Sequence, residues 1–341
     1  MLLDEWQAVP QVLGAVKRAV DDDARAGRFL LTGSVRGEIE AETWPGTGRL
    51  VRLAMYGLTL RETLGRNGED TFAARLARGV IDEFGLPSEV PDLGGYVELA
   101  LRGGFPEAVL RLSGEARAAW LDGYLEQLLT RDTELLGPRD PARLRRYFQA
   151  LALSTAGLPE HKTLYDAASI NRKTAVAYDQ LLANLFVLDL VPAWTANRLS
   201  RLVRAPKRYL VDPSLVAAAL RLDGAAVMRD GDLLGRLLDT FVAAQLRPEL
   251  EVAASRPLVY HLREKEGRRE IDLLVELAAA DVIALEVKAT ATPGSNDARH
   301  LAWLRDSLGD RFLAGAVLHT GPQAFKLAER VFALPICALW G

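Results

Sequence analysis

The sequence predicts an α/β protein made of several domains. A strand–helix–strand pattern occupies residues 1–34, helical patterns dominate the middle of the chain, and strands alternate with helices after residue 230. The length of 341 residues corresponds to roughly two or three domains. A content of 49% apolar and 26% charged residues is typical of folded globular proteins and excludes disordered and fibrous chains.

The charge balance and the single cysteine exclude further classes of protein. With 42 Lys and Arg against 45 Asp and Glu residues, the chain is not a uniformly basic nucleic-acid coat, although a local basic patch stays compatible. Cys337 has no second cysteine for a disulfide or a cysteine zinc site, which indicates a reducing cytoplasm. The sequence shows no run of 18 uncharged apolar residues and no basic signal-peptide region. We expect a cytoplasmic protein without membrane partners and leave its oligomeric state open.

The first 34 residues place polar side chains where two predicted strands end. A short apolar strand runs into Asp4 and Glu5, helical spacing follows over residues 9–20, and a second strand ends in Thr32-Gly33-Ser34. In a nucleotide-binding sheet, one carboxylate at such a strand end holds Mg²⁺ and a second polarises the attacking water. A hydroxyl on the next strand end is placed to sense the γ-phosphate. An ordinary strand–helix–strand unit with polar strand ends is the alternative interpretation.

These residues also resemble a known family. The middle of an AAA-type ATPase module is similar to Leu2-Leu3-Asp4-Glu5-Trp6-Gln7, Val9-Pro10 and Phe29-Leu30-Leu31-Thr32-Gly33-Ser34. The family is prokaryotic and carries a C-terminal domain of unknown function. The resemblance implies a truncated P-loop ATPase core over residues 1–65, with Asp4 and Glu5 as the Walker B pair and Glu5 catalytic. It also implies a sensor at Thr32 or Ser34 and a phosphate contact at Arg49 or Arg52, so the implied nucleotide-binding set is Asp4, Glu5, Thr32, Ser34 and Arg49.

The chain departs from this family at the phosphate-binding loop. The Walker A pattern G-x-x-x-x-G-K-[ST] does not occur in the sequence, and only three residues precede Asp4. The strand, loop and helix that carry this pattern belong to a unit of roughly 30 residues or more. Without the loop, no backbone amides and no lysine hold the β- and γ-phosphates. We therefore expect a start that is misassigned, trimmed or naturally truncated, with ATP as a cofactor only if the missing segment is present.

The middle of the chain predicts a helical linker region over residues 66–142 and a winged helix-turn-helix over 143–215. The linker contains the turn cluster 101–107, and a long helix is expected over 116–136. In the second region, a short helix, the turn 169–171 and a helix over 172–186 precede two strand candidates. The order resembles a winged helix, in which the second helix enters the major groove of DNA with its N-terminus first. Asn171, Arg172, Lys173 and Thr174 are then expected to face DNA.

A basic segment follows that helix. Residues 197–208 hold five cations and no acid, which predicts a phosphate-binding wing. The alternative is a packing module with an idle charged face. The sequence therefore predicts DNA as a partner, through Asn171, Arg172, Lys173, Arg201, Arg204 and Arg208, with Arg198 and Lys207 as further cations of the wing.

Residues 225–341 predict a separate α/β domain. A helix over 233–246 comes first, and a terminal helix–strand pair is expected to complete the domain. Between them the patterns predict strands over 258–263, 270–276, 282–287 and 313–319 and a helix that contains 300–308.

Two of these strands carry the pattern Ile271-Asp272 and Glu286-Val287-Lys288, which resembles the core of PD-(D/E)XK, restriction-endonuclease-like enzymes. Residues 286 and 288 are two positions apart, so their side chains point to the same face of a strand. Two carboxylates suit Mg²⁺, and a lysine positions or deprotonates water. The expected catalytic set is Asp272, Glu286 and Lys288, and the expected metal ligands are Asp4, Asp239, Asp272 and Glu286.

The alternative for this domain is an inactive scaffold in which Glu286 and Lys288 form an internal ion pair. Asp239 is a shorter substitute for the glutamate expected on the first helix, and Gln245 removes a charge from the metal site. Three functions therefore stay open: a nucleotide-dependent, DNA-associated protein without its P-loop, a Mg²⁺-dependent nuclease, and a non-catalytic DNA-binding or interaction protein.

The missing Walker A pattern generates a first prediction. Purified residues 1–341 should show no ATP hydrolysis above background, because nothing in the sequence supplies the phosphate-binding loop. A coupled phosphate-release assay measures this. Turnover that disappears in the Glu5→Gln variant would contradict the prediction.

Overall fold

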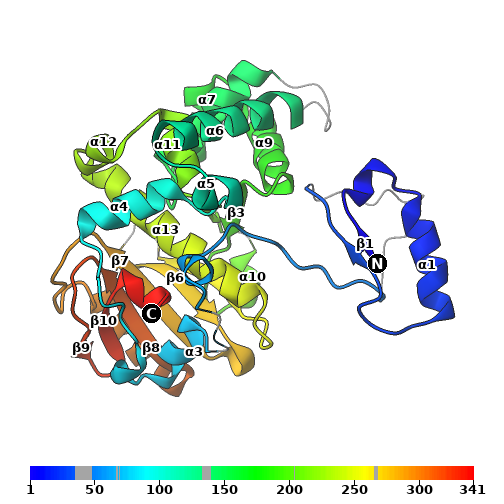
Figure 1. Ribbon diagram of the computed structural model, residues 1–341. Coiled ribbons are helices and arrows are strands. Elements are labelled where there is room, and N and C mark those ends of the chain that lie inside the picture. The colour runs from blue at the N-terminus through cyan, green and yellow to red at the C-terminus, as the bar shows by residue number, and fades with distance from the viewer. Residues whose placement is uncertain (35–47, 67, 69, 133–139, 203, 265–267) are drawn as a thin grey trace.

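The molecule consists of three parts. In the computed structural model, shown in Figure 1, a small N-terminal unit stands to one side, a layer of helices forms the upper half, and a β-sheet forms the lower half. None of the helices in the described parts of the chain is both long and apolar enough to cross a membrane. The structure describes residues 1–34, 48–66, 68, 70–132, 140–202, 204–264 and 268–341.

The N-terminal unit has the strand–helix–strand order that the sequence predicts. Strands β1 (Leu2–Leu3) and β2 (Leu30–Leu31) pair in parallel, and helix α1 (Val12–Asp22) connects them. Leu13 and Val16 are the buried residues of α1. Because β1 and β2 run parallel, the residues that follow them lie at the same edge of this two-stranded sheet.

Short helices precede α4 (Leu93–Arg102), with which the helical layer begins. A tight turn joins α4 to α5 (Pro106–Leu110), within the turn cluster predicted over residues 101–107. A Cβ atom on Gly104 would come within 2.6 Å of the Leu58 carbonyl oxygen, so only glycine allows this approach of the two backbones. The remaining elements of this stretch are α2 (Leu60–Thr63), α3 (Phe72–Arg78), α6 (Gly114–Gln127) and the π-helix Leu128–Asp132.

The helix predicted over 116–136 is thus divided. The α-helical part ends at Gln127, one π-helical turn continues it, and residues 133–136 lie outside the described residues.

Three helices and a hairpin follow in the predicted order. Ser169 adopts a left-handed conformation after the first helix of the turn, and the Asn171 side chain caps the next helix by accepting a hydrogen bond from the Thr174 amide at 2.9 Å. The hairpin strands pair antiparallel, and a short helix lies in the connection between them. The elements are α7 (Pro141–Leu153), α8 (His161–Ala168), α9 (Arg172–Asn184), β3 (Leu188–Val191), α10 (Arg198–Arg201) and β4 (Lys207–Leu210).

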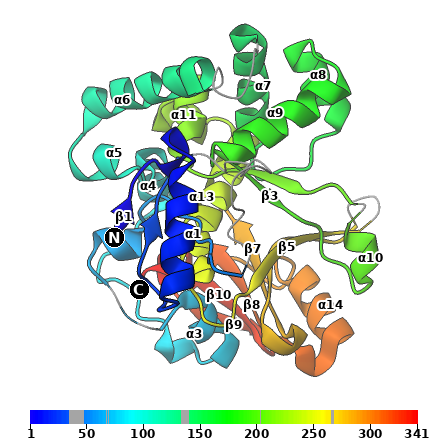
Figure 2. The same cartoon turned by 90° about the vertical axis from the view of Figure 1, so that its right-hand side faces the viewer.

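Helix α13 (Gly231–Glu251) joins the helical layer to the sheet. It follows α11 (Ser214–Leu220) and α12 (Gly224–Met228), and it contacts α4 and α12 as well as strand β7 (Val282–Lys288). Figure 2 shows α13 running down from the helices to the sheet. Buried residues of the helical layer, of α13 and of one sheet face belong to one hydrophobic core, so these two parts are not independently packed.

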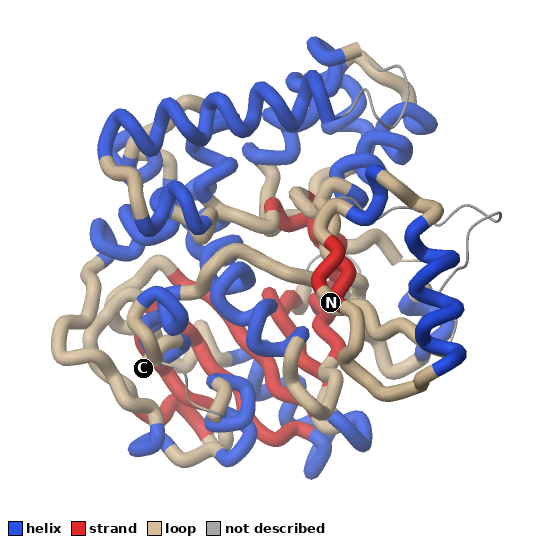
Figure 3. Tube along the Cα trace, turned by 45° about the vertical axis from the view of Figure 1, so that its right-hand side comes forward, coloured by secondary structure: helices blue, strands red, loops and turns tan. Residues whose placement is uncertain are grey.

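The sheet has six strands in the order β5-β6-β7-β8-β10-β9. Strands β7, β8 and β10 run parallel to one another, whereas β5, β6 and β9 pair antiparallel to their neighbours. Helices α3 and α13 cover one face, and α14 (Arg299–Leu308) covers the other. Figure 3 shows the strands between these helices. The remaining strands are β5 (Leu258–Arg263), β6 (Glu270–Glu276), β8 (Phe312–His319), β9 (Phe325–Ala328) and β10 (Val331–Pro335).

The end of the domain corrects one prediction. The expected terminal helix–strand pair is absent from residues 320–341, where β9 and β10 form two strands before a single 3-10 turn at Ile336–Leu339. A short apolar run does not distinguish helix from buried strand by its pattern alone. Here β10 inserts between β8 and β9, and that pairing decides its conformation.

A buried ion pair connects α9 to the hairpin and generates a stability prediction. Asp179 accepts hydrogen bonds from the Arg208 guanidinium at 2.7 Å and from the Tyr147 hydroxyl at 2.7 Å. Replacing Asp179 with Ala leaves a buried cation without this carboxylate, which should lower the free energy of unfolding by about 3 kcal/mol. Urea denaturation followed by circular dichroism measures the loss.

The matched control is Glu107→Ala. It removes the exposed ion pair between Glu107 and Arg111, whose shortest distance is 3.2 Å. Exposed pairs contribute roughly 0–1 kcal/mol, so this variant should stay close to the wild type. Equal losses in the two variants would show that the Asp179 pair is no more important than a surface contact.

Candidate functional site

Polar residues at the two N-terminal strand ends contact one another. The Thr32 hydroxyl donates a hydrogen bond to the Asp4 carboxylate at 2.5 Å. The Ser34 hydroxyl donates to the Glu5 carboxylate at 3.3 Å, and the Gln7 amide also donates to Glu5. Each carboxylate after β1 is therefore paired with a hydroxyl after β2, and both carboxylates are exposed.

Arg49 does not join this cluster. Its guanidinium pairs with Asp21 of α1 at 2.6 Å. This contact lies on the helix and not at the strand ends. Among the predicted nucleotide-binding residues, the structure thus brings together Asp4, Glu5, Thr32 and Ser34 and places Arg49 elsewhere.

The first turn of α9 presents the predicted DNA-facing residues to solvent. Arg172 and Lys173 are exposed, and neither forms an ion pair with another described residue. Val176 and Gln180 extend this exposed face along the helix. The acid of the same helix, Asp179, points to the interior and pairs with Arg208. The exposed face of α9 therefore carries cations and an amide but no exposed carboxylate.

The hairpin corrects the expectation of an exposed basic wing. Arg208 and Lys207 lie in β4 with side chains that are 5% and 2% exposed. Arg201 lies on Trp194 and Tyr260, with its guanidinium carbon 5.2 and 4.8 Å from the two ring centres. These cations make internal contacts because the hairpin packs against the sheet.

Of the three hairpin arginines predicted to bind DNA, Arg204 is the exposed one. Its guanidinium donates to the Arg263 carbonyl at 2.9 Å, on the edge strand of the sheet. The structure therefore does not bring Arg201, Arg204 and Arg208 onto one face with Arg172.

A buried ionic cluster forms where β4 meets the C-terminal domain. The Lys207 ammonium lies 2.6 Å from the Asp239 carboxylate of α13 and 3.0 Å from the Asp272 carboxylate of β6. The Tyr209 hydroxyl donates to Asp239 at 3.1 Å, and the Val287 amide donates to Asp272 at 3.0 Å. Because every oxygen of the two acids faces a donor, the cluster is satisfied by protein groups alone.

The charge state of this cluster follows from its contacts. Burial opposes a charged ammonium, but the adjacent Asp239 and Asp272 carboxylates outweigh burial and hold the pKa of Lys207 well above its usual value. For Asp272, burial also opposes the charge, yet Lys207 and the Val287 amide lower its pKa. Burial raises the pKa of Asp239 to about 7, although Lys207 opposes this shift. Lys207 is therefore a cation beside the ionised Asp272, and Asp239 titrates near neutral pH.

Glu286 extends the cluster on β7. The register pairs Leu273 with Leu285, so Asp272 and Glu286 occupy the next opposite positions on adjacent strands. The Lys288 ammonium donates to Glu286 at 3.2 Å, and the His300 ring lies 3.7 Å from the same carboxylate. Burial raises the pKa of Glu286 to about 7, and repulsion from Asp272 adds to the shift. Asp239, Asp272, Glu286, Lys207 and Lys288 are called the carboxylate cluster below.

The cluster in this conformation does not fit the Mg²⁺ that the nuclease pattern implies. The Lys207 ammonium occupies the space between Asp239 and Asp272. In the described part of the chain, no three His, Cys, Asp or Glu side chains form a group that suits a metal ion. Gln245 is also not a ligand, because its side-chain oxygen accepts from the Leu60 amide at 2.7 Å.

The sequence analysis did not predict Lys207 as a member of the cluster, or Tyr209 and His300 as residues that contact its acids. Lys207 was assigned to the basic wing, and His300 only to a helix. One signal was present in the alternation of the segment Lys207-Arg208-Tyr209-Leu210, because every second residue of a strand shares a face. Nothing in the sequence indicates which partner each face meets.

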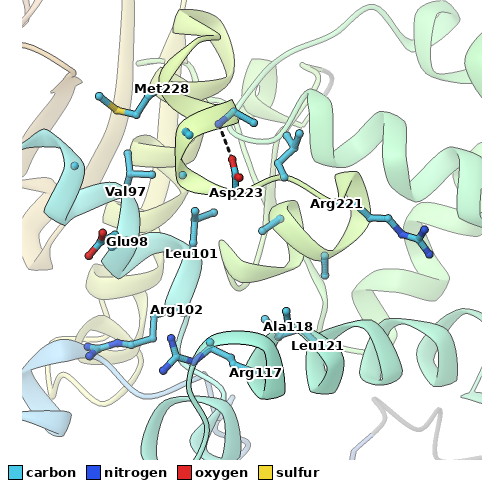
Figure 4. A pocket seen from close by; sticks show the side chains of 18 of the residues that line it. Val97, Glu98, Leu101, Arg102, Arg117, Ala118, Leu121, Arg221, Asp223 and Met228 are labelled. Atoms are coloured by element: carbon cyan, nitrogen blue, oxygen red, sulfur yellow. Dashed lines mark hydrogen bonds between the residues drawn. The ribbon is translucent and has the colours of Figure 1, made fainter.

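A separate groove of about 1350 Å³ lies between α4, α6, α11 and α12. Figure 4 shows Val97, Leu101 and Leu121 on its walls and Arg102 and Arg117 near one end. Burial lowers the pKa of Arg102, and the nearby Arg117 lowers it further. The groove contains none of the residues that the sequence predicts for nucleotide, DNA or metal.

Comparisons with known proteins match three stretches of the chain. Residues 1–64 match the model of an AAA domain, residues 94–226 match a domain of unknown function (DUF8612), and residues 234–339 match a second domain of unknown function (DUF4143). Similar curated proteins are "Uncharacterized protein Rv2008c" of Mycobacterium tuberculosis and "Uncharacterized protein Mb2031c" of Mycobacterium bovis. Each is 30% identical over 338 residues, which are 98% of this chain and 67% of the relative.

The chain belongs to this AAA-type ATPase family. The AAA match contains Asp4, Glu5, Thr32 and Ser34, and the DUF4143 match contains Asp239, Asp272, Glu286 and Lys288. The hairpin with Lys207 falls in the DUF8612 match. The carboxylate cluster of this family member therefore combines residues from two of its matched regions. No solved structure matches the chain.

The hairpin also docks on the sheet through His261 of β5. The Trp194 amide donates to the His261 carbonyl at 2.6 Å, and the His261 amide donates to the Pro192 carbonyl at 3.0 Å. The ring nitrogen Nε2 lies 3.2 Å from the Ala205 carbonyl oxygen, which suits a neutral ring that donates there. Burial lowers the pKa of His261 to about 4.

This shift predicts a pH dependence of stability. The folded protein holds His261 neutral down to about pH 4, while the unfolded chain protonates it near pH 6.5. The unfolded state therefore binds more protons between these values, and the contribution of His261 is present above pH 6.5 and lost as the pH falls toward 4. The loss should be about 3 kcal/mol. Urea denaturation at several pH values measures it.

The control for this prediction is His261→Gln, which keeps a side-chain donor without a titrating ring. Other buried acids titrate in the same range, so the difference between wild type and variant is the quantity of interest. The acid-induced loss should be smaller in the variant. Identical pH profiles would show that His261 does not contribute.

Proposed function

We propose that this AAA-type ATPase family protein binds DNA through the exposed first turn of α9. The observation that carries the proposal is the exposed face of this helix, where Arg172 and Lys173 have no ion-pair partner among the described residues. Asn171 caps the helix directly before them, so the two cations lie at its N-terminal end. Both the cations and the helix N-terminus favour phosphate.

The same face has side chains suited to base edges. Gln180 and Val176 follow Arg172 at helical spacing and are exposed. An amide forms hydrogen bonds with base edges, and an aliphatic side chain contacts the thymine methyl group in the major groove. The order α8, turn, α9 and hairpin supports a winged-helix mode of binding, in which α9 enters the groove.

The nuclease alternative is less well supported. Its proposed residues Asp272, Glu286 and Lys288 lie together, but the Lys207 ammonium forms ion pairs with Asp272 and with Asp239. In the described conformation the C-terminal domain therefore acts, in our proposal, as a scaffold that holds the hairpin and α9.

The N-terminal unit supports a second proposed role, in nucleotide binding. Exposed carboxylate oxygens suit Mg²⁺, and the hydrogen bond from Thr32 to Asp4 fixes one of them at a strand end. Asp4 would hold the metal of a bound nucleotide, and Glu5 would orient water beside it. The Walker A pattern, which holds the phosphates, does not occur in the sequence. The residues Asp4, Glu5, Thr32 and Ser34 by themselves therefore do not bind the phosphates.

The DNA proposal predicts a change in the salt dependence of binding. The double variant Arg172→Ala, Lys173→Ala should bind a DNA duplex more weakly and should lower the slope of log affinity against log salt by about 2, one for each lost phosphate contact. Fluorescence anisotropy titrations at several salt concentrations measure both quantities.

Lys326→Ala is the matched control, because Lys326 is an exposed lysine of β9 in the C-terminal domain, far from α9 in Figure 1. It should leave the affinity and the slope close to those of the wild type. DNA binding that is unaffected by the α9 double variant, or equally reduced by the control, would exclude this interface.

A further inference from the structure

The carboxylate cluster contains a cation that belongs to another part of the fold. Lys207 comes from the hairpin, whereas Asp239 and Asp272 come from α13 and the six-stranded sheet, at sequence separations of 32 and 65 residues. The side chain of Lys207 is 2% exposed. A lysine is almost never fully buried unless it is paired, so its partners decide its position.

The place that Lys207 takes is the one that a small cation would take. Two carboxylates close to one another repel each other unless a positive charge lies between them. Oxygens of Asp239 and Asp272 both contact the same ammonium, and Glu286 is the next acid on the adjacent strand. The ammonium thus supplies one positive charge at the place where an oxygen-liganded metal would otherwise lie.

A second contact holds the hairpin in this position. Arg201, in the helix between β3 and β4, pairs with Glu276 of β6 at 2.9 Å, and the Trp194 indole donates to the same carboxylate at 2.9 Å. The Arg201 guanidinium also donates to the Thr195 carbonyl at 2.7 Å. The hairpin is therefore held on the sheet by side-chain ion pairs of Lys207 in the cluster and of Arg201 near the tip, in addition to the backbone contacts with His261.

We propose that the β3–β4 hairpin is an internal stopper, in which Lys207 occupies the cation position of Asp239, Asp272 and Glu286. The carboxylate cluster accepts a divalent cation only when the hairpin leaves or when Lys207 is replaced. This inference rests on the ion pairs of Lys207 and not on DNA binding by α9. It also explains why residues with a nuclease-like pattern do not form a metal-binding group in this conformation.

The test measures metal binding directly. The full chain with Lys207→Met, which keeps an unbranched side chain but removes its charge, should bind Mn²⁺ with a Kd about ten-fold or more below that of the wild type. Electron paramagnetic resonance of free Mn²⁺ gives the Kd without any enzyme assay. The added change Asp272→Asn should abolish the gain, and Lys326→Met, which removes an exposed lysine, should behave like the wild type.

A second variant covers the case in which Lys207→Met does not fold. Glu276→Gln leaves Lys207 and the three acids intact but weakens the Arg201 contact, so it should raise Mn²⁺ affinity by opening the hairpin. Folded Lys207→Met that binds Mn²⁺ no better than the wild type overturns the proposal. If that variant is unfolded, wild-type affinity in Glu276→Gln overturns it, and tighter binding supports it.

Discussion

The alternation of side chains along β4 is the constraint on which the assembly of the protein depends. Lys207 and Tyr209 face the C-terminal domain and contact Asp239, while Arg208 faces α9 and contacts Asp179. Successive residues of a strand point to opposite sides, so one four-residue strand connects two parts of the fold. Both connections are buried ion pairs. Moving β4 by one residue would reverse the two faces and leave buried charges without partners.

Buried charges of this kind specify position more than they add stability. The free-energy cost of desolvating two ions offsets much of the free energy gained from their attraction. The loss of one partner, in contrast, is strongly destabilising. The hairpin therefore has one favoured position, with Lys207 between its two acids. The Arg201–Glu276 pair and the backbone contacts of Trp194 with His261 hold the same hairpin farther along the sheet. These contacts also explain why a segment rich in cations is not an open basic surface.

The N-terminal unit is organised differently. In its helix α1 only Leu13 and Val16 are buried, and Leu2 and Leu30 on the paired strands are more than half exposed. A two-stranded sheet has too little surface to bury its own apolar residues. The geometry of Asp4 and Glu5 therefore depends on hydrogen bonds with Thr32 and Ser34 at the strand ends. In contrast, the carboxylate cluster is held by a packed core around α13 and the sheet.

The sequence by itself determined features that depend on local periodicity. It located β5 and β6 with their observed bounds, put Glu286 and Lys288 on one face, and placed Asp4 and Thr32 where the two N-terminal strands end. Only the tertiary structure decided the partners of Lys207, Arg201 and Arg208, because these contacts join residues 29 to 75 positions apart. A charged residue in a strand gives the same sequence pattern whether its side chain faces solvent or two buried carboxylates. Which of these two environments surrounds the side chain depends on how the hairpin packs against the sheet. The local sequence pattern does not predict that packing.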